Sequence, residues 1–227
     1  MDRVKYPRTL HVPWSPGATS DDKVFTEEAL LEAFAGRRVV VTEKMDGENT
    51  TIYSDGTCHA RSIDSGHHES RSWVKGLAAR LKGEIPDGWR VCGEYLYAKH
   101  SIEYKDLPGY FLVFAIYDER DVCLWWEDTV EWCELLDLPH VPVLYTGHWD
   151  DPDQFKDWDI DGDGWTPSLY GTDYEAGAEG YVIRLYHSFH ARDFSRSVAK
   201  YVRAGHVQTD DHWMHQAVVP NKLKGAK

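Results

Sequence analysis

The sequence predicts an α+β fold in which strands outnumber helices. Short runs rich in Val, Ile, Tyr and Phe recur along the chain, and Gly, Asp or Pro residues separate them as turns separate strands. Only three segments carry a helical pattern, and no repeat of fixed period is visible. With 227 residues, of which 42% are hydrophobic, the chain can bury a substantial core. We expect one globular domain, or one domain with a small appendage.

The first 36 residues predict an arm followed by a helix. The opening KYPRTLHVPWSPGATSDD is dense in Pro, Ser and Gly, which is typical of irregular structure. Thr26 is then a suitable N-cap, two glutamates occupy the first turn, and Gly36 ends the pattern. One face of this short amphipathic helix is apolar and consists of Leu30, Leu31 and Phe34.

From Val39 the pattern becomes that of β-strands. The runs VVVTEK, NTTIYS and TCHARS follow one another between residues 39 and 62. Asp55-Gly56 separates the last two and is a strong hairpin signal. We expect these three runs to form a meander of antiparallel strands.

The remaining elements alternate between helices and strands. Trp73, Leu77 and Leu81 recur at four-residue spacing and predict a second helix that ends near Gly83. A third helix is expected from about Glu127 to Leu136. The other predicted strands are WRVCGEYLY, GYFLVFAIYD, VPVLYT, EGYVIRLY and SVAKYVR.

Charge and hydropathy limit the classes of protein to consider. The net charge of −13 opposes the binding of a polyanion such as RNA. However, residues 147–178 hold nine acids and only one lysine, so this stretch predicts an acidic surface loop and a basic surface remains open elsewhere. No apolar run has the length of a membrane span, and the N-terminus lacks a secretory signal. We therefore expect a soluble, cytoplasmic protein with no membrane partner, whose four cysteines are reduced.

Lys44 ends the apolar run VVVTEK and stands two residues before Asp46-Gly47. A lysine amine is protonated near neutral pH, so a nucleophilic lysine needs burial or cationic neighbours to lower its pKa. The end of an apolar strand supplies partial burial, and a glycine turn leaves room for a ligand to approach the backbone. Alone, the K-x-D-G pattern is equally consistent with a surface lysine before a turn.

The residues around Lys44 are part of an ordered series. EKMDGEN resembles motif I of the covalent nucleotidyltransferases, the superfamily of ATP-dependent ligases and mRNA capping enzymes. Further motifs of that superfamily have counterparts downstream in the expected order, namely Arg61 in CHARS (motif Ia), Gly93-Glu94 in VCGEYLY (III), Phe114 in FLVFAIYD (IIIa), Glu179-Gly180 in EGYVIR (IV) and Lys200 in VAKYVR (V). Glu43, Asn49 and the EGYVIR form are more similar to the RNA ligases than to the DNA ligases. The resemblance to bacterial and phage RNA ligases covers nearly the whole chain.

The resemblance implies the nucleotidyltransferase fold, with two antiparallel β-sheets and flanking helices around an ATP cleft. It also implies a single adenylyltransferase (RNA ligase) domain over residues 1–227. Only about two dozen residues follow motif V, which is too few for the separate C-terminal nucleic-acid-binding domain of many ligases.

A chemical role for four residues also follows from the resemblance. Lys44 would attack the α-phosphate of ATP and form a covalent lysyl-AMP. Arg61 and Lys200 would neutralise phosphate charge and, as cations, lower the pKa of Lys44. Glu179 would help hold Mg²⁺ or Mn²⁺ through its carboxylate.

The resemblance assigns the remaining matched residues mainly to the nucleotide. Phe114 would stack on adenine, and Glu94 would accept hydrogen bonds from the ribose hydroxyls. Glu43 would lie near the adenine edge, and Gly47 would keep the turn narrow. Asn49 would line the nucleotide site and serve the later steps.

Each of these residues also has a purely structural interpretation. By pattern alone Phe114 is a core strand residue, while Glu94 and Glu179 could be solvent-facing or ion-pair partners. Glutamates within apolar strands need a partner, which favours a functional site. Lys200 and Arg203 could lie on an exposed strand face, or Arg203 could supply a second cation.

Three functions follow from these observations. In the RNA ligase reaction, AMP passes from lysine to a 5′-phosphate on RNA, and a 3′-hydroxyl then displaces it. A basic face or a partner protein would have to supply the grip on RNA. The alternatives are an adenylyltransferase that acts on a small molecule or a protein, and a non-catalytic module that binds nucleotides or RNA ends.

Two other clusters do not predict metal sites. The series Asp159-x-Asp161-x-Asp163-Gly164 matches the start of an EF-hand loop, but Tyr170 stands where that loop needs Glu, and no flanking helices are expected. The histidines near the C-terminus fit no standard zinc spacing; they are His206, His212 and His215.

Overall fold

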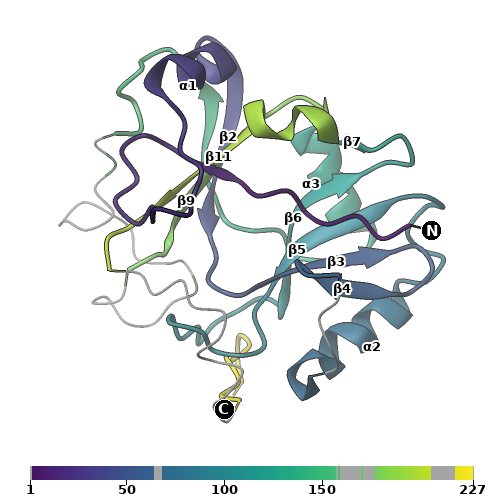
Figure 1. The fold of residues 1–227 in the computed structure, drawn as a ribbon. Coiled ribbons are helices and arrows are strands. Elements are labelled where there is room, and N and C mark those ends of the chain that lie inside the picture. The colour runs from purple at the N-terminus through teal and green to yellow at the C-terminus, as the bar shows by residue number, and fades with distance from the viewer. Residues whose placement is uncertain are drawn as a thin grey trace.

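A computed structural model describes residues 2–63, 68–156, 158, 170, 177–205 and 218–226. In this part of the chain two β-sheets pack against each other, with helices at their flanks (Figure 1). Buried side chains from both sheets share the cores, since Val39 and Ile183 of one sheet cluster with Cys92 and Ala115 of the other. The structure confirms the α+β class and the two sheets.

The first sheet has five strands in the order β1-β11-β9-β2-β8. Their bounds are β1 Leu10–His11, β2 Arg38–Lys44, β8 Val143–His148, β9 Gly180–Leu185 and β11 Val198–Val202. Neighbouring strands are antiparallel except at one edge, where β1 runs parallel to β11. The opening segment is therefore not wholly irregular, because backbone hydrogen bonding to β11 orders part of it as a strand.

The second sheet has six strands in the order β10-β7-β6-β5-β3-β4, and all its pairs are antiparallel. Their bounds are β3 Glu48–Tyr53, β4 Cys58–Ala60, β5 Arg90–Tyr95, β6 Phe111–Tyr117, β7 Val122–Cys123 and β10 Phe189–His190. The predicted meander is wrong in one respect, because β2 pairs with β8 and β9 and not with β3. Its run VVV is buried on both faces of the first sheet. Because β3 belongs to the second sheet, the turn at 45–47 carries the chain from one sheet to the other.

The three predicted helices are present as α1 Glu27–Phe34, α2 Ser72–Arg80 and α3 Trp126–Leu135, with two short 3₁₀ helices, η1 Glu69–Arg71 and η2 Ala191–Arg196. The hydroxyl of Thr26 accepts a hydrogen bond from the backbone N–H of Ala29 (3.1 Å), which confirms the expected N-cap. Within the described ranges, no helix is long and apolar enough to cross a bilayer.

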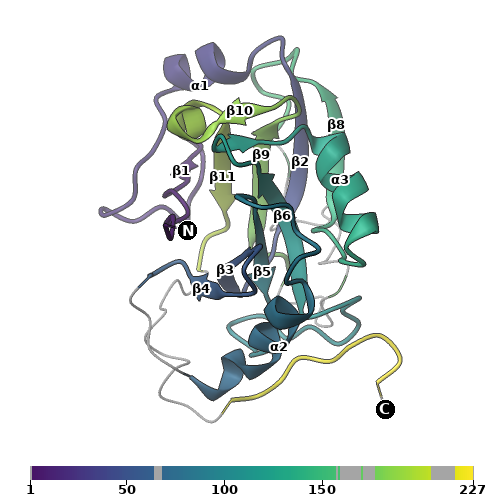
Figure 2. The same cartoon turned by 90° about the vertical axis from the view of Figure 1, so that its right-hand side faces the viewer.

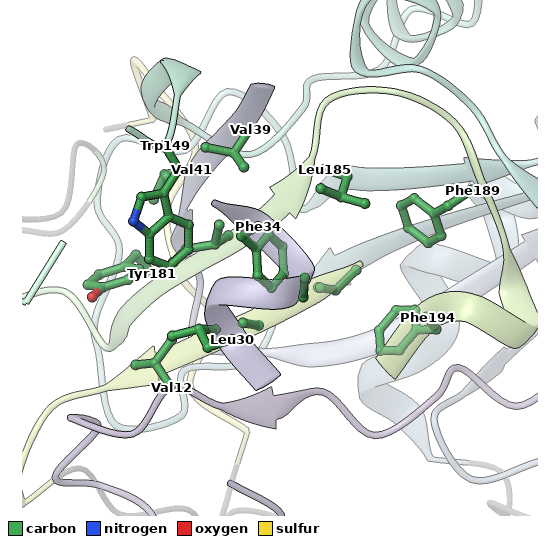
Figure 3. Close-up of a cluster of buried hydrophobic side chains, with 14 of the residues drawn as sticks. Val12, Leu30, Phe34, Val39, Val41, Trp149, Tyr181, Leu185, Phe189 and Phe194 are labelled. Carbon is green, nitrogen blue, oxygen red and sulfur yellow. The ribbon is translucent and has the colours of Figure 1, made fainter. Parts of the chain in front are cut away.

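Helix α1 packs against the five-stranded sheet through a cluster of aromatic and aliphatic side chains (Figure 3). Phe34 stacks on Trp149 with ring centroids 5.6 Å apart, and both side chains are fully buried. Val41 of β2 and Tyr181 of β9 complete this side of the core. Trp149 thereby anchors the start of the acidic segment to the sheet that carries Lys44.

We call residues 2–25 the N-terminal arm. Its first part, residues 2–9, crosses from β1 to the second sheet (Figures 1 and 2). The backbone N–H of Val4 donates to the hydroxyl of Tyr53 (2.8 Å), and Arg3 pairs with Asp55 (3.1 Å). The ring of Tyr6 lies edge-on to Phe114, with centroids 5.1 Å apart. The arm therefore connects the edge of one sheet to strands β3 and β6 of the other.

Gly180 begins β9 opposite Lys44, and its lack of a side chain is essential to the fold. A Cβ atom there would lie 1.9 Å from the carbonyl oxygen of Tyr201, so the backbone would have to move.

We expect Gly180→Ala to lower the free energy of unfolding by about 2 kcal/mol. Urea unfolding checks this. The control is Gly76→Ala on α2, where a Cβ meets nothing within 4 Å, and which should be slightly stabilising.

Candidate active site

The strand register places two of the predicted cations on one face of the five-stranded sheet. Lys44 pairs with Gly180, and Lys200 pairs with Val182, two residues further along β9. Because side chains alternate between the faces of a strand, Lys44 and Lys200 project from the same face. His11 of β1 is paired with Lys200 and continues this row.

Lys44 forms an ion pair inside the protein. Its Nζ lies 2.5 Å from Oε1 of Glu179, and the two side chains are only 24% and 5% exposed. Burial acts to lower the pKa of Lys44, but the carboxylates of Glu179, Glu94 and Asp46 outweigh it and raise that pKa above the ordinary value. The amine points into the cluster of carboxylates and is protonated in the absence of ligand.

On balance the pKa of Lys44 is therefore raised, not lowered, in the free protein. Lys44 and Lys200 repel each other, but the carboxylates around the Lys44 amine outweigh the effect of the cations on its pKa. The pKa of Lys200, in contrast, is lowered. Burial, followed by the charge of Lys44, lowers the pKa of Lys200 to about 8.

Glu94 lies across from Lys44 on the second sheet, where it pairs with Asn49 of β3. The backbone N–H of Gly47 donates to Oε1 of Glu94 (3.2 Å). Burial raises the pKa of Glu94 to about 8, Glu179 and Asp46 add to the rise, and Lys44 opposes it. At neutral pH the carboxyl group is mostly protonated in the free protein.

Gly47 allows the turn after Lys44 to lie against β5. A Cβ atom at this position would be 2.6 Å from the carbonyl oxygen of Tyr95 and 3.2 Å from Cγ of Glu94. The glycine is thus required for close approach of two chain segments, in agreement with the narrow turn that the sequence predicts.

Sequence reasoning missed the structural role of Asp46. One carboxylate oxygen of Asp46 accepts hydrogen bonds from the backbone N–H groups of Ser101 and Ile102, each at 2.8 Å. Its own N–H donates to the hydroxyl of Tyr104 (2.9 Å). Asp46 therefore fixes the turn against the segment after β5. Its place in the K-x-D-G pattern was the available signal, but its partners lie 55 or more residues away.

Asn49 and Arg61 carry buried atoms that suit a polar ligand. Oδ1 of Asn49 and Nε of Arg61 are buried and have no hydrogen-bond partner within the described residues. Asn49 is paired with Glu94, and Arg61 follows β4 directly, one residue beyond the partner of Thr50. Its charge helps lower the pKa of Lys200, after the larger effects of burial and Lys44. Since buried polar atoms are nearly always satisfied, these two indicate a site that a ligand completes.

Phe114 and Glu43 are placed beside this cluster. Phe114 is the one half-buried residue of β6, whose other residues are buried, and it packs against two of the hydrophobic clusters. Tyr6 contacts its ring edge-on. Glu43 is 2% exposed. Its carboxylate lies near Tyr104, because burial and then the carboxylates of Asp46 and Glu43 raise the pKa of that tyrosine. Phe114 thus lies on the strand next to that of Glu94, and Glu43 directly precedes Lys44 on β2.

Two segments considered in the sequence lie outside the described residues. They are the DGDG series at 159–164 and the histidine-containing stretch at 206–217. Among the residues that are described, no group of three or more His, Cys, Asp and Glu side chains forms a metal site.

The pKa of Glu94 leads to a prediction about stability. Its folded-state pKa of about 8 exceeds the ordinary 4.5, so between these values the unfolded chain ionises while the folded protein keeps the proton. Stability should therefore fall as pH rises from 4.5 to 8. We expect Glu94→Gln to be more stable than the wild type by about 2 kcal/mol at pH 8.5 and by little at pH 4.5.

Urea unfolding at the two pH values measures this difference. The exposed Glu84 provides a control, because Glu84→Gln should change stability equally at both. A Glu94→Gln variant that loses stability at pH 8.5 would contradict the assigned burial cost.

The two facing sheets, with a buried lysine and carboxylates between them, have the fold of the ligase and capping-enzyme nucleotidyltransferases. A family model described as RNA ligase matches residues 37–202, which is most of the chain. The chain belongs to the RNA ligase family. No curated protein sequence matches it.

Solved structures of Naegleria gruberi RNA ligase share the fold. A variant of that ligase with ATP and Mn superimposes with a TM-score of 0.55 at 18% identity, over 76% of this chain and 52% of the other. A second variant with ATP and Mn gives 0.57 at 17% identity, over 88% and 60%. The same ligase with PPi gives 0.55 at 17% identity, over 89% and 61%. The chain thus spans between half and two thirds of the length of these structures.

Proposed function

We propose that the protein is an ATP-dependent RNA ligase that forms a covalent lysyl-AMP on Lys44. AMP would then pass to an RNA 5′-phosphate, and a 3′-hydroxyl would displace it to seal the strand. The observation that carries this proposal is the Lys44 amine, held 2.5 Å from Glu179 in a site that also contains Glu94, Arg61 and Lys200. Family membership and the resemblance of the motifs support the same reaction.

In the first step the N–P bond forms between Nζ of Lys44 and the α-phosphate, and the bond to pyrophosphate breaks. The amine must first lose its proton, which Glu179 stabilises in the free protein. Mg²⁺ or Mn²⁺ would supply neutralisation of charge at the phosphate oxygens. A Glu179 carboxylate shared with such an ion would hold the proton of Lys44 less strongly, so nucleotide binding and activation of Lys44 would be coupled.

The donor set suits a divalent cation that arrives with nucleotide. Mg²⁺ is commonly held by one or two carboxylates together with substrate phosphates and water, and Glu179 is the carboxylate that we assign to it. Arg61 and Lys200 would bind phosphate oxygens, for which the buried and unsatisfied Nε of Arg61 is a suitable donor. Oδ1 of Asn49 would accept a hydrogen bond from the nucleotide or from the RNA end.

The nucleoside would occupy the region beside the second sheet. We assign Phe114 to adenine stacking, because it is the half-buried residue of an otherwise buried strand. Glu94 would accept hydrogen bonds from the ribose hydroxyls, and the N–H of Gly47 donates to its Oε1 and helps to position the carboxyl group. Glu43 would lie at the adenine edge, next to Lys44 on β2.

Residues 1–227 are proposed to act as a single adenylyltransferase domain. Both ends of the chain pack onto the same body, since β1 extends the first sheet and the backbone N–H of Asn221 donates to the carbonyl of Tyr97 (2.8 Å). The side chain of Asn221 also accepts from the N–H of Tyr104 (2.9 Å). This tail therefore braces the segment that holds Asp46.

The net charge of −13 favours a second candidate acceptor, which is a small molecule or a protein in place of RNA. This alternative shares the lysyl-AMP step and differs only in the group that receives AMP. A basic face or a partner protein would be needed for RNA and would not be needed for the alternative.

The experiment is intact mass spectrometry of the protein after incubation with ATP and either Mg²⁺ or Mn²⁺. We expect the mass to increase by one AMP. The isolated adduct is then mixed with 5′-phosphorylated RNA, with the corresponding DNA, or with buffer. Loss of the adduct with RNA, together with a sealed product, supports an RNA ligase. An adduct that no nucleic acid discharges supports the alternative acceptor, and the absence of any adduct with either metal refutes both.

A further inference from the structure

The N-terminal arm lies against the strand that carries Lys200. His11 pairs with Lys200 in the parallel register of β1 and β11. Its N–H donates to the carbonyl of Lys23 (2.8 Å), and its carbonyl accepts from the N–H of Phe25 (2.8 Å). The chain therefore leaves β1, turns through residues 12–22, and returns beside His11. Asp22 lies on this returning segment.

Hydrogen bonds fix the imidazole of His11 in one orientation. Oγ of Ser15 accepts from the backbone N–H of Val202 (2.9 Å) and lies 2.8 Å from Nδ1 of His11. The same hydroxyl is farther, 3.3 Å, from the carbonyl of Val202, so we assign its hydrogen to Nδ1. In that tautomer Nδ1 is the acceptor and Nε2 carries the ring hydrogen. Nε2 faces Oδ1 of Asp22 at 3.6 Å. His11 is completely buried, and Nε2 has no hydrogen-bond partner within the described residues.

Asp22 is held from its other side by Thr19. Its Oδ2 accepts from both the N–H (3.1 Å) and the hydroxyl (2.9 Å) of Thr19. The side chain is 13% exposed and carries a charge next to the row of His11 and Lys200. Burial acts to raise the pKa of Asp22, but the bonds from Thr19, followed by Lys200 and His11, bring it below its ordinary value. The carboxylate is therefore ionised at neutral pH.

The charges that face Lys200 come from five elements. Burial and Lys44 of β2 lower its pKa to about 8, with a further contribution from Arg61 after β4. Asp22 of the arm and Glu179 before β9 act in the opposite direction. Burial, followed by Lys200, lowers the pKa of His11 of β1 to about 4, so the imidazole is neutral and adds no positive charge. Glu179 is already engaged by Lys44, which leaves Asp22 as the counter-charge on the arm side.

We propose that Asp22, held by Thr19 beside the imidazole of His11, is a positioning residue that keeps Lys200 in its ammonium form at the phosphate-binding site. This proposal rests on the proposed function, in which Lys200 neutralises phosphate. A neutral Lys200 would leave phosphate charge uncompensated, and a half-buried amine near two other cations is prone to lose its proton. The arm is thus part of the candidate active site.

The first test compares the rate of AMP transfer to Lys44 between pH 6.5 and 9.5 by intact mass. Wild-type activity should rise with pH and then fall as Lys200 loses its proton. In Asp22→Asn, which keeps the shape and the bonds from Thr19, we expect the fall to begin about one pH unit lower. In the Lys200→Arg background the guanidinium stays charged, so Asp22→Asn should no longer move the profile.

The control is Asp21→Asn, an equivalent change at the exposed neighbouring position, which should leave the profile unchanged. A purely structural role of Asp22 predicts a loss that is equal at all pH values and persists with Lys200→Arg. Either that result or an unchanged profile in Asp22→Asn overturns the proposal. Thermal melting of each variant shows whether it is folded.

The second test does not depend on ATP. Lysine labelled with ¹³C at Cε allows the proton of Lys200 to be titrated by NMR in the free protein, with Lys200→Arg used to assign the signal. We expect the midpoint to fall by about one pH unit in Asp22→Asn and to stay unchanged in Asp21→Asn. An unmoved midpoint refutes the proposal. If the wild type forms no AMP adduct but the midpoint moves as expected, the proposed function fails while the effect of Asp22 on the protonation of Lys200 stands.

Discussion

Lys44→Ala and Lys44→Arg should both abolish formation of the AMP adduct. Alanine removes the nucleophile. Arginine keeps the positive charge beside Glu179 but replaces the amine with a guanidinium that stays protonated and does not attack phosphorus. We expect adduct formation to fall below detection in intact mass spectra after hours with ATP and Mg²⁺.

The two variants separate chemistry from folding. Lys44→Ala leaves the buried carboxylate of Glu179 without this cation and should lower stability, whereas Lys44→Arg should melt close to the wild type. Lys75→Ala on the exposed face of α2 is the matched control and should retain the adduct. If Lys44→Arg still acquired AMP at an undiminished rate, another residue would be the nucleophile and the proposed function would lose its basis.

Glu179→Gln should slow adduct formation by about 1,000-fold. Two effects oppose each other in this variant. Loss of the carboxylate charge lowers the pKa of Lys44 and favours the neutral amine. The same substitution removes the proposed ligand for the divalent cation, and this cation would stabilise charge in the transition state. We expect the loss of the metal ligand to be the larger effect.

The dependence of the rate on metal and pH distinguishes these effects. The residual activity of Glu179→Gln should need a higher concentration of Mg²⁺ or Mn²⁺ than the wild type, and its rise with pH should begin at lower pH. Glu134→Gln, an exposed change on α3, serves as the control. A Glu179→Gln variant with wild-type metal dependence would remove Glu179 from the metal site.

The free protein holds Lys44, the proposed nucleophile, in its protonated form. Glu179 is the main group that raises the pKa of Lys44, and burial keeps Glu94 mostly protonated at neutral pH. Binding of a polyanion with its metal would redistribute these charges, because the cation and the carboxylates would then have new partners. The lysine is therefore expected to become nucleophilic only when nucleotide and metal occupy the site together.

Most elements of the fold were predictable from local pattern. Thr26 caps α1, apolar spacing marks α2, and alternating or continuous apolar runs mark the strands, because propensity and periodicity act over a few residues. The order of the motifs likewise identified the family that the match over residues 37–202 shows. The parallel pairing of β1 with β11 lacked any such signal, since two residues carry no periodicity.

The sequence named candidate site residues that the structure brings close together, but it did not give their electrostatics. The sequence names Lys44, Glu94, Glu179 and Lys200, and the structure brings their charges within reach of one another. It also adds Asp46 and Asp22, which sequence reasoning treated as turn and arm residues. Their partners are Ser101 and His11, and neither contact follows from the spacing of residue types.

Local pattern in the chain thus decided where strands and helices form and which side chains are available for chemistry. Only the tertiary structure decided that β2 leaves the meander, that carboxylates rather than cations control Lys44, and that the arm reaches Lys200. The physical reason is distance. Propensity depends on neighbours in the chain, whereas a pKa depends on charges a few ångströms away, and Lys44 is 135 positions from the Glu179 that holds its proton.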